Sequence, residues 1–304
     1  MIAENHQHGY IATRFAATML FIVCTLVLPM LMTSCNTPAA HTEQHESAMA
    51  RILRSGKIRC SYLIYSSYFR KDPNTGQLSG IFHDAVEEIG KNSGLKVEWV
   101  EEVGYENIFP GLDHDRYDVF CGGLWPNASR AKAASFTSPI FYSAITAWCR
   151  PNDNRFSHSV SSINSPSVKI ATIDGAMEDI IAKTDYPKAQ RISLPELSPF
   201  VLNLLGIVGK KADVTFAEPM VVHEFLAKNP GALKQIRPDQ PVRIFGNSLV
   251  VKRGETELKD FLDIGLQEIV NNGQVENILE KYEPQRSTFH PIALPYRLHG
   301  DKNK

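Results

Sequence analysis

The side chains that could do binding chemistry lie where predicted strands end. Arg130 follows the strand-like stretch 117–121; its guanidinium can offer two parallel donors to a carboxylate and stays charged. Glu218 follows the stretch 213–217 and could offset the cost of desolvating a bound cation. Asp174–Met177 separates a strand from a helix, where free N–H groups can hold an anion. A surface arginine, a loop glutamate and a tight turn are the alternatives.

Aromatic side chains gather in the loop after the first predicted strand, at Tyr65, Tyr68 and Phe69. Their flat faces can pack on an aliphatic stem or attract a cation. We expect one of them to lie in the core, and Tyr68 or Phe69 to face a ligand. Trp125 could stack on a ligand or pack under the following loop, and Tyr105 is a further aromatic candidate.

Catalytic and metal-binding patterns are not evident in the sequence. It has no Ser/His/Asp or Cys/His set, no phosphate loop and no Cys/His spacing typical of a metal site. Glu218 or His83 could serve as an acid or base, although His83 is expected at the surface or as a helix cap. The sequence therefore predicts a binding protein, with no cofactor, no metal and no ATP site of its own.

The bulk composition is that of a globular protein. The chain has 304 residues, 43% of them hydrophobic and 21% charged, with a formal net charge of -1. This length allows about two units that each bury a core. The balanced charge argues against nucleic acid as a partner, because binding phosphates needs a basic excess.

Strands and helices alternate from Arg51 onwards, which predicts α/β units with parallel sheets and right-handed crossovers. In the first unit, Gly94 is expected to end a helix. The expected strands of this unit are 57–63, 95–100, 117–121 and 138–148, and the expected helices are 81–91 and 108–112.

A second unit follows the Ser/Asn/Pro-rich stretch 151–167 and is expected to be inserted into the first. The expected elements are strands 168–173, 190–194 and 213–217, helices 177–183, 199–206 and 220–227, the run 242–251, and helices 258–271 and 275–282. Two crossovers, near 147–152 and 243–249, could act as a hinge that closes over a ligand. The predicted division is lobe 1 at 51–148 and 244–284, lobe 2 at 149–243, and an unassigned tail at 285–304.

The N-terminus is predicted to be an export signal. An apolar run from Phe15 to Leu31 follows Arg14 and ends at Met32-Thr33-Ser34-Cys35, as in a secretory signal. The small residues before Cys35 resemble a bacterial lipoprotein signal, which implies a signal peptide at 1–34, lipid on Cys35 and a flexible tether at 35–50. An uncleaved membrane helix is the alternative. Both place the body of the protein outside the cytoplasm.

Three cysteines lie beyond this segment, at Cys60, Cys121 and Cys149. An odd number in an oxidising compartment leaves at least one free thiol or one intermolecular partner. All three lie in apolar, strand-like stretches, so burial as small hydrophobic residues is the simplest expectation. Whether Cys60 pairs with Cys121 stays open.

An ordered set of segments carries a resemblance to a known family. It consists of 55–58 (SGKI), 75–84 (TGQLSGIFHD), 118–123 (DVFCGG), Arg130, 136–139 (FTSP), 210–213 (KKAD) and Gly273, Ile278, Lys281 and Tyr282. From about Gly56 to Pro284 the chain resembles the family 3 solute-binding proteins of bacterial ABC importers. The resemblance implies a type II, two-lobed periplasmic-binding-protein fold that captures a small carboxylate-bearing solute, such as an amino acid, and delivers it to a membrane permease.

The resemblance also assigns roles to the candidate residues. Arg130 matches the arginine that grips the ligand carboxylate, and Gly123 closes the strand beside it. Glu218 stands where the family usually has an aspartate that pairs with the ligand's amino group. The aromatic loop residues Tyr68 and Phe69 match a wall of the ligand site.

Three positions depart from the family pattern. Ala176 replaces a threonine, so the helix start can keep backbone contacts through Gly175 and Ala176 but not the hydroxyl contact. Trp125 and Asn127 replace small hydroxyl residues before the arginine. These changes leave two alternatives to a transport receptor: a binding fold of the cell envelope that has lost its ligand, and an enzyme on the same fold, since periplasmic dehydratases resemble these receptors.

Overall fold

The computed structural model describes residues 46–65, 67–196, 198–283 and 288–293. The predicted signal peptide, Cys35, most of the predicted tether and residues 294–304 of the tail lie outside the described residues. No helix in the described part of the chain is long and apolar enough to span a membrane.

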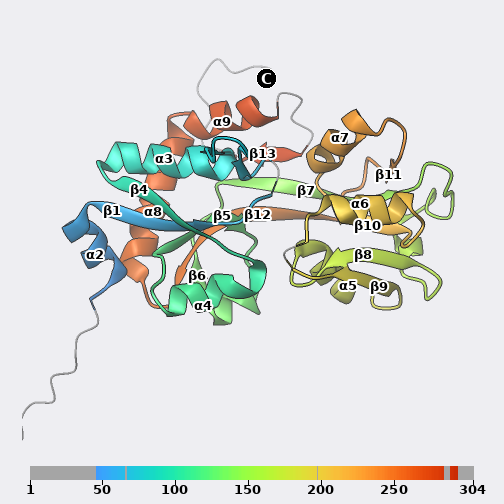
Figure 1. Cartoon of the computed structure of the whole chain (residues 1–304), viewed down its shortest axis with the longest axis horizontal. Helices are drawn as coiled ribbons and strands as arrows, with labels where there is room; N and C mark the ends of the chain where they lie inside the picture. The colour runs from blue at the N-terminus through green and yellow to red at the C-terminus, as the bar shows by residue number, and fades with distance from the viewer. Residues whose placement is uncertain (1–45, 66, 197, 284–287, 294–304) are drawn as a thin grey trace, which may run out of the picture. The chain divides into compact units, whose positions relative to one another are not determined.

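Lobe 1 is built on the strand order β4-β1-β5, in which neighbouring strands run parallel. Helices α3, α8 and α9 cover one face and α4 covers the other (Figure 1). The elements are α2 Ala48–Ser55, β1 Lys57–Tyr62, β2 Arg70–Lys71, β3 Leu78–Ser79, α3 Ile81–Ser93, β4 Lys96–Glu102, η2 Tyr105–Asn107, α4 Ile108–Asp113, β5 Val119–Leu124, η3 Arg130–Lys132, β6 Ala134–Phe136, α8 Thr256–Asn271, α9 Gln274–Tyr282 and β13 Phe289–Pro291.

Lobe 2 repeats this plan with the parallel order β10-β8-β9. Alternate residues of β8 face opposite sides, so Ile170 packs with α5 and Ala171 packs with α6 and α7. The elements are η4 Val160–Ile163, β8 Lys169–Ile173, α5 Met177–Asp185, β9 Gln190–Leu194, α6 Val201–Val208, β10 Val214–Ala217, α7 Pro219–Lys228 and β11 Lys234–Ile236.

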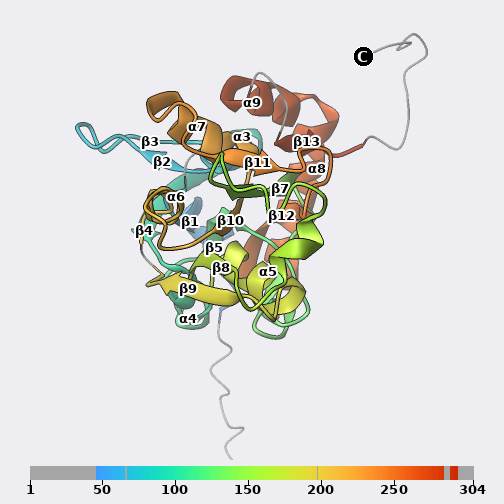
Figure 2. The ribbon, with the colours of Figure 1, turned by 90° about the vertical axis from the view of Figure 1, so that its right-hand side faces the viewer.

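Two long antiparallel strands join the lobes, β7 Phe141–Cys149 and β12 Arg243–Lys252. Each pairs with the other over one half and with a lobe over the other half. The second half of β7 pairs with β10, and the second half of β12 pairs with β5. Figure 1 shows both strands running from one lobe into the other, and Figure 2 views the molecule along this direction. The strand β12 covers the crossover predicted at 243–249, whereas β7 passes between the lobes just before the one predicted at 147–152.

Most predicted elements are present, with shifted ends. Gly94 ends α3 in the left-handed conformation, as expected. The predicted tether is shorter than proposed, because α2 begins at Ala48, which is buried and donates its N–H to Glu255. The sequence interpretation missed the β2–β3 hairpin, and it left the tail unassigned although β13 pairs with β7 there.

The cysteines differ in state. Cys60 of β1 and Cys121 of β5 form a disulfide, with 5.6 Å between their Cα atoms. Both are buried, as expected, and the pairing that the sequence left open is formed. Cys149, at the end of β7, is buried and free, and burial raises the pKa of its thiol to about 11.

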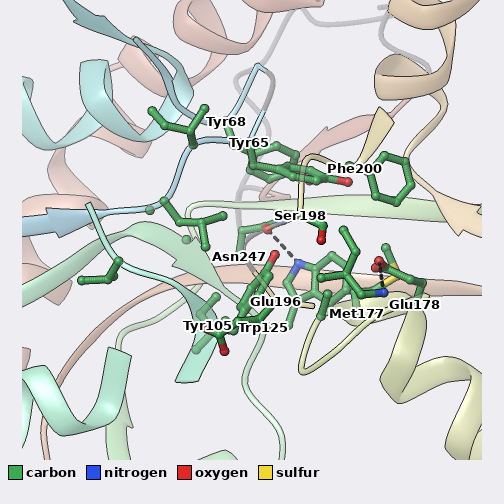
Figure 3. A pocket seen from close by; sticks show the side chains of 18 of the residues that line it. Tyr65, Tyr68, Tyr105, Trp125, Met177, Glu178, Glu196, Ser198, Phe200 and Asn247 are labelled. Carbon is green, nitrogen blue, oxygen red and sulfur yellow. Dashed lines mark hydrogen bonds between the residues drawn. The ribbon is translucent and has the colours of Figure 1, made fainter. Parts of the chain in front are cut away.

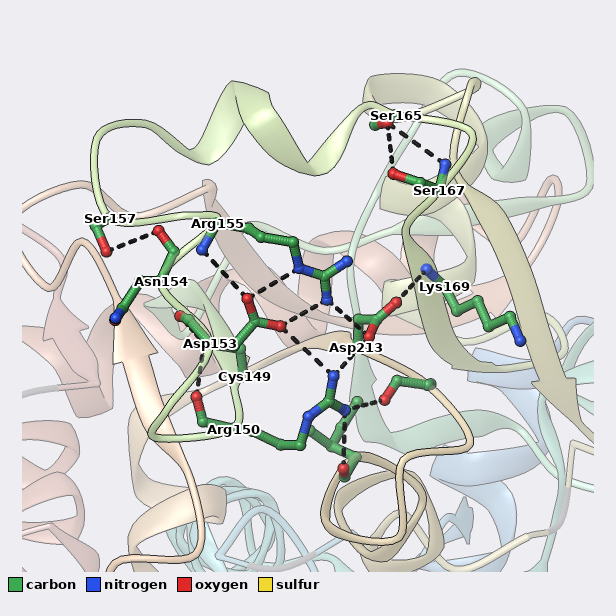
Figure 4. Close-up of polar contacts among 12 residues, drawn as sticks. Cys149, Arg150, Asp153, Asn154, Arg155, Ser157, Ser165, Ser167, Lys169 and Asp213 are labelled. Atoms are coloured by element: carbon green, nitrogen blue, oxygen red, sulfur yellow. Dashed lines mark hydrogen bonds and ion pairs between the residues drawn. The ribbon is translucent and has the colours of Figure 1, made fainter.

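One ion-pair cluster fixes the amino-terminal edge of the strands in each lobe. In lobe 2, Asp213 accepts hydrogen bonds from the guanidinium groups of Arg150 and Arg155 and from the N–H of Lys169 (Figure 4). In lobe 1, the buried Asp118 accepts from the side chains of Arg51 and Arg59. Each aspartate thus ties the start of a central strand to its neighbours.

Candidate functional site

A cavity of about 310 Å³ lies between the lobes, at the carboxyl ends of β1, β5, β8 and β10. We call it the cleft. Open α/β sheets place ligands at this edge. Its wall combines aromatic side chains (Tyr65, Tyr68, Tyr105, Trp125 and Phe200) with one arginine and four glutamates. Figure 3 shows these aromatic rings around the opening, with Ser198, Asn247 and Met177 among them.

Arg130 is brought into the cleft by the tight turn after β5. Gly123 adopts a φ of +78°, and a Cβ atom at this position would come within 2.0 Å of the Phe82 ring, so only glycine fits. The side chain of Asn127 accepts the N–H of Arg130 at 2.9 Å and fixes the start of the short helix η3. The sequence thus uses Gly123 and Asn127 to aim the arginine.

The guanidinium of Arg130 has backbone partners rather than an acid. It donates to the carbonyl oxygen of Trp125 at 3.0 Å and to that of Gly175 in lobe 2 at 3.2 Å. Desolvation lowers its pKa below the ordinary arginine value. No carboxylate pairs with Arg130 among the described residues. A half-buried cation without an acid partner would gain from a carboxylate ligand.

Glu218 lies directly after β10 and is 1% exposed. Its two carboxylate oxygens accept hydrogen bonds from the hydroxyl groups of Tyr65 at 2.8 Å and Tyr68 at 2.9 Å. Burial raises the pKa of Glu218, against the opposing effect of these two donors. Burial of the two tyrosines, together with the Glu218 charge, raises their pKa, so both hydroxyl groups stay protonated and donate. These bonds connect lobe 1 to lobe 2.

Glu178 is a second buried carboxyl group in the cleft wall, in the first turn of α5. Its Oε1 atom accepts the N–H of Ile173 at 3.0 Å and the side-chain amide of Asn203 at 3.1 Å. Burial raises its pKa to about 8. The sequence interpretation missed this residue. A signal was present, because Glu178 shares a helix face with the apolar Ile181 and Ala182.

The aromatic candidates divide between cleft and core. Tyr68 lines the cleft, as does Tyr65. Phe69 does not, and this expectation was wrong: the chain folds back so that Tyr65 pairs with Phe69, whose ring then packs on Tyr62 at 4.7 Å in the core of lobe 1. The core role expected for one of the three falls to Phe69.

Trp125 lines the cleft and is also packed firmly. Its ring stacks on Phe245 of β12, with 4.0 Å between ring centroids, and its Nε1 donates to Asn247 at 2.8 Å. Asn127, by contrast, lies outside the cleft wall, because its amide is used to hold the Arg130 backbone. This placement does not support the ligand contact predicted for Asn127, which stays a prediction.

The start of α5 is not the open anion site that the sequence suggested. Ala176 lines the cleft and Gly175 does not; the carbonyl of Gly175, rather than its N–H, faces Arg130. The carboxyl group of Glu178 already interacts with its own backbone N–H and that of Ile173 at this helix start. The positive end of the α5 dipole is therefore already occupied by the carboxyl group of Glu178.

His83, the second acid or base candidate, lies away from the cleft on α3. It is half-buried, bonds Asp84 at 3.0 Å and stacks on Trp99. A metal site is also not formed by the described side chains: no group of three or more His, Cys, Asp or Glu residues among them could hold an ion.

Two α/β lobes joined by two strands enclose an aromatic, charged cleft whose volume suits a small molecule. The match to the model of the bacterial extracellular solute-binding proteins, family 3, spans residues 64–285, and the chain belongs to this family. The resemblance seen in the sequence is thereby confirmed, as is the type II fold.

Two curated relatives illustrate the range of proteins that the chain resembles. It is 22% identical over 71% of its length to a probable histidine-binding protein of Campylobacter jejuni, covering 79% of that protein. It is also 22% identical over 80% of its length to cyclohexadienyl dehydratase of Pseudomonas aeruginosa, covering 89% of that enzyme.

Solved structures show the same fold. An ancestral amino-acid-binding protein, a precursor of cyclohexadienyl dehydratase, aligns with a TM-score of 0.67 at 23% identity, over 78% of this chain and 99% of that one. An ABC transporter binding component from Wolinella succinogenes, complexed with lysine, aligns with a TM-score of 0.66 at 19% identity, over 74% of this chain and 95% of that one.

Proposed function

We propose that this protein is the amino-acid receptor of an ABC importer. The observation that carries the proposal is the pairing of charges in the cleft: Arg130, without an acid partner among the described residues, and the buried Glu218. An amino acid supplies one carboxylate for the guanidinium and one ammonium group for the carboxylate. Binding then exchanges two poorly compensated charges for two ion pairs.

The receptor cycle follows from the two connecting strands. With β7 and β12 as a hinge, the open form takes up the solute on lobe 1 at Arg130. Closure brings Glu218 and the start of α5 over it. The Tyr65 and Tyr68 hydroxyl groups donate hydrogen bonds to Glu218 across the cleft and thereby stabilise the closed form. The closed receptor then docks on a membrane permease, and a separate ATPase drives import.

Binding by the full chain in detergent tests this proposal. After unfolding and refolding to remove carried-over solute, thermal unfolding is recorded with amino acids, polyamines and small organic acids. A ligand at about 100 times its dissociation constant adds about 2.7 kcal/mol to stability. The amino-acid signal should weaken by about 2 kcal/mol or more in Arg130→Ala. Unchanged affinity in that variant would refute the role of Arg130.

The receptor is proposed to work outside the cytoplasm, held by lipid on Cys35. The family is extracellular, and the small residues before Cys35 provide the acceptor pattern. Mass spectrometry of the purified protein should find a lipid-modified Cys35 at the N-terminus, and Cys35→Ser should leave the leader uncleaved. Retention of residues 1–34 in the unaltered protein would instead favour the membrane-helix alternative.

A second candidate function is a dehydratase. One observation favours it: Glu218 is a buried carboxyl group whose pKa is raised, in a cleft with an arginine that could orient an acidic substrate. Such a group can protonate a departing hydroxyl, which leaves as water. Incubation with cyclohexadienyl acids, followed by mass spectrometry, distinguishes the two. Loss of water that disappears in Glu218→Gln supports the enzyme; stoichiometric capture without conversion supports the receptor.

A further inference from the structure

The charge of the cleft wall is strongly acidic. Four glutamates and one arginine line it. Glu102 is exposed and Glu196 half-buried, so water screens both. Glu178 and Glu218 are 3% and 1% exposed. After Arg130 and Glu218 have each received one charge of an amino acid, as proposed above, Glu178 remains as a buried acid without a counter-charge.

The neighbouring residue shows how the protein treats an acid that serves structure alone. Asp179 follows Glu178 in α5 and is also buried, but it pairs with Lys183 and with Arg191 of β9, each at 2.5 Å. Glu178 has no lysine, arginine or histidine partner among the described residues. Its contacts among the described residues are its own N–H, the Ile173 N–H and the side-chain amide of Asn203, whose Oδ1 atom is buried without a partner.

We propose that the solute is a basic amino acid and that Glu178 is the residue that selects its side-chain cation. This inference rests on the amino-acid receptor proposed above and names the class of solute. The described residues supply an arginine for the carboxylate, Glu218 for the α-ammonium group and Glu178 for a second positive charge. A basic side chain can form an ion pair with ionised Glu178, whereas a neutral or acidic one gains no such contact there.

The surroundings of Glu178 suit a long cationic side chain. Met177, Phe200, Tyr105 and Trp125 line the cleft together with Glu178, and Figure 3 shows Met177 and Phe200 on the same side of the view as Glu178. Methionine and aromatic faces can pack along an aliphatic stem, and aromatic faces also attract a cation. An amino acid extended across the cleft would thus meet apolar surface along its length and an acid at its end.

Binding of a cation beside Glu178 should also release a proton. Burial raises the pKa of Glu178 to about 8, and the charges of Glu218 and Asp179 act in the same direction. Tyr65 and Tyr105 interact electrostatically with Glu178 from lobe 1 and stay protonated, because burial raises their pKa as well. Near neutral pH the carboxyl group holds its proton. A cation favours the ionised form, so the proton leaves when the solute binds.

Calorimetry on the refolded full chain in detergent tests this inference. Lysine and arginine are compared with the neutral analogues norleucine and citrulline, at about pH 7 in two buffers of different ionisation enthalpy. The basic amino acids should bind at least about 10-fold more tightly than the neutral ones. Their binding heat should depend on the buffer in the sense of proton release.

The variant Glu178→Gln is the matched test, since glutamine keeps the shape and the acceptor for Ile173. It should lose the preference for basic amino acids and the buffer dependence, while neutral analogues bind as before or better. Asp239→Asn, at an exposed acid of lobe 2 that does not line the cleft, is the control and should retain both properties. A structural role alone for Glu178 would leave the charge preference and the proton release in place, and that result would overturn the inference.

The outcomes separate this inference from the receptor proposal. If no amino acid binds the refolded chain, the proposed function fails first. If neutral amino acids bind as tightly as basic ones, or basic ones bind without proton release, only the selection by Glu178 is refuted. Both the affinity comparison and the proton-release measurement are made on the unaltered protein. They therefore test the inference even if Glu178→Gln does not fold.

Discussion

Two pairs of buried or half-buried carboxylates lie at opposite ends of the strands in the described part of the chain. Asp118 and Asp213 lie just before β5 and β10, and each pairs with two arginines and with a backbone N–H of the neighbouring strand. Glu218 lies just after β10 and Glu178 lies in the helix that follows β8. Both have only uncharged hydrogen-bond partners among the described residues.

The first pair of carboxylates stabilises the fold, whereas the second pair is available for binding. Burial alone would raise the pKa of Asp213, but the Lys169 N–H and two guanidinium groups hold this pKa below its ordinary value. Burial instead raises the pKa of Glu178 and Glu218. The amino-terminal edge thus contains its own counter-charges, whereas the cleft lacks them. The cleft carboxylates cost stability in the free protein, and a cationic ligand can recover that cost.

Removal of an aspartate at the amino-terminal edge should have the largest effect. Asp118→Ala leaves Arg51 and Arg59 without their shared acid, and we expect a loss of about 3 kcal/mol in unfolding free energy. Urea unfolding measures it. Asp239→Ala, which breaks the exposed pair with Arg237, is the control and should cost far less, because water screens that pair. Equal losses in the two variants would mean that the Asp118 ion pairs contribute no more to stability than an exposed pair does.

The pH dependence of stability should expose Glu178. Its pKa is about 8 in the folded protein and about 4.5 as an ordinary carboxyl group. The folded state therefore binds the extra proton, and stability falls as pH rises from about 5 to about 8, by at most about 1.4 kcal/mol per pH unit. Urea unfolding at several pH values should show a shallower fall in Glu178→Gln. Parallel curves for both proteins would contradict this assignment.

Glu218→Gln should stabilise the free protein while it weakens binding. Glutamine removes a buried charge, and the Tyr65 hydroxyl can still donate to its oxygen, so we expect a gain of about 1 kcal/mol. The matched change Asp118→Asn should lower stability, because that aspartate has arginine partners. Urea unfolding compares the two variants. A loss of stability in both would remove the distinction between the two ends of the strands.

The smallest effect is expected at the exposed rim between the lobes. Arg70 pairs with Glu224 of α7 at 2.5 Å, and both side chains are about 40% exposed (43% and 39%). Screening limits such a pair to about 0.5 kcal/mol, which is about twofold in solute affinity for Arg70→Ala. Calorimetric titration measures it. Arg237→Ala, remote from the lobe contacts described, should leave affinity unchanged; a tenfold loss in Arg70→Ala would show that this pair controls closure.

The fold could be predicted because its determinants are local. Gly94 ends α3 as its sequence position suggested, and the alternation of strand and helix patterns required parallel sheets. Short strands that pair with other segments could not be predicted from the sequence. The two residues of β2 and of β3, and β13 in the tail, carry no periodicity and are fixed only by their partners.

The candidate site was predicted where it follows strand ends, and incompletely elsewhere. Arg130, Ala176 and Glu218 line the cleft because parallel strands bring their carboxyl ends together. Glu178 was missed because acids are common in the first turn of a helix for reasons unrelated to ligands. Its burial depends on the packing of α6, through Asn203, which the local sequence does not encode. Phe69 was misplaced because a single backbone reversal decides which ring faces inward.

The pairing of β13 with β7 adds a third link across the hinge. The hydroxyl of Thr288 accepts the N–H of Met220 at the start of α7, while Glu283 accepts the N–H groups of Thr288 and Phe289. The segment after α9 thus reaches from lobe 1 to lobe 2 and resists torsion of the connecting strands. A chain that ends at Tyr282 should therefore open and close faster than the full chain, and its solute should have a shorter residence time.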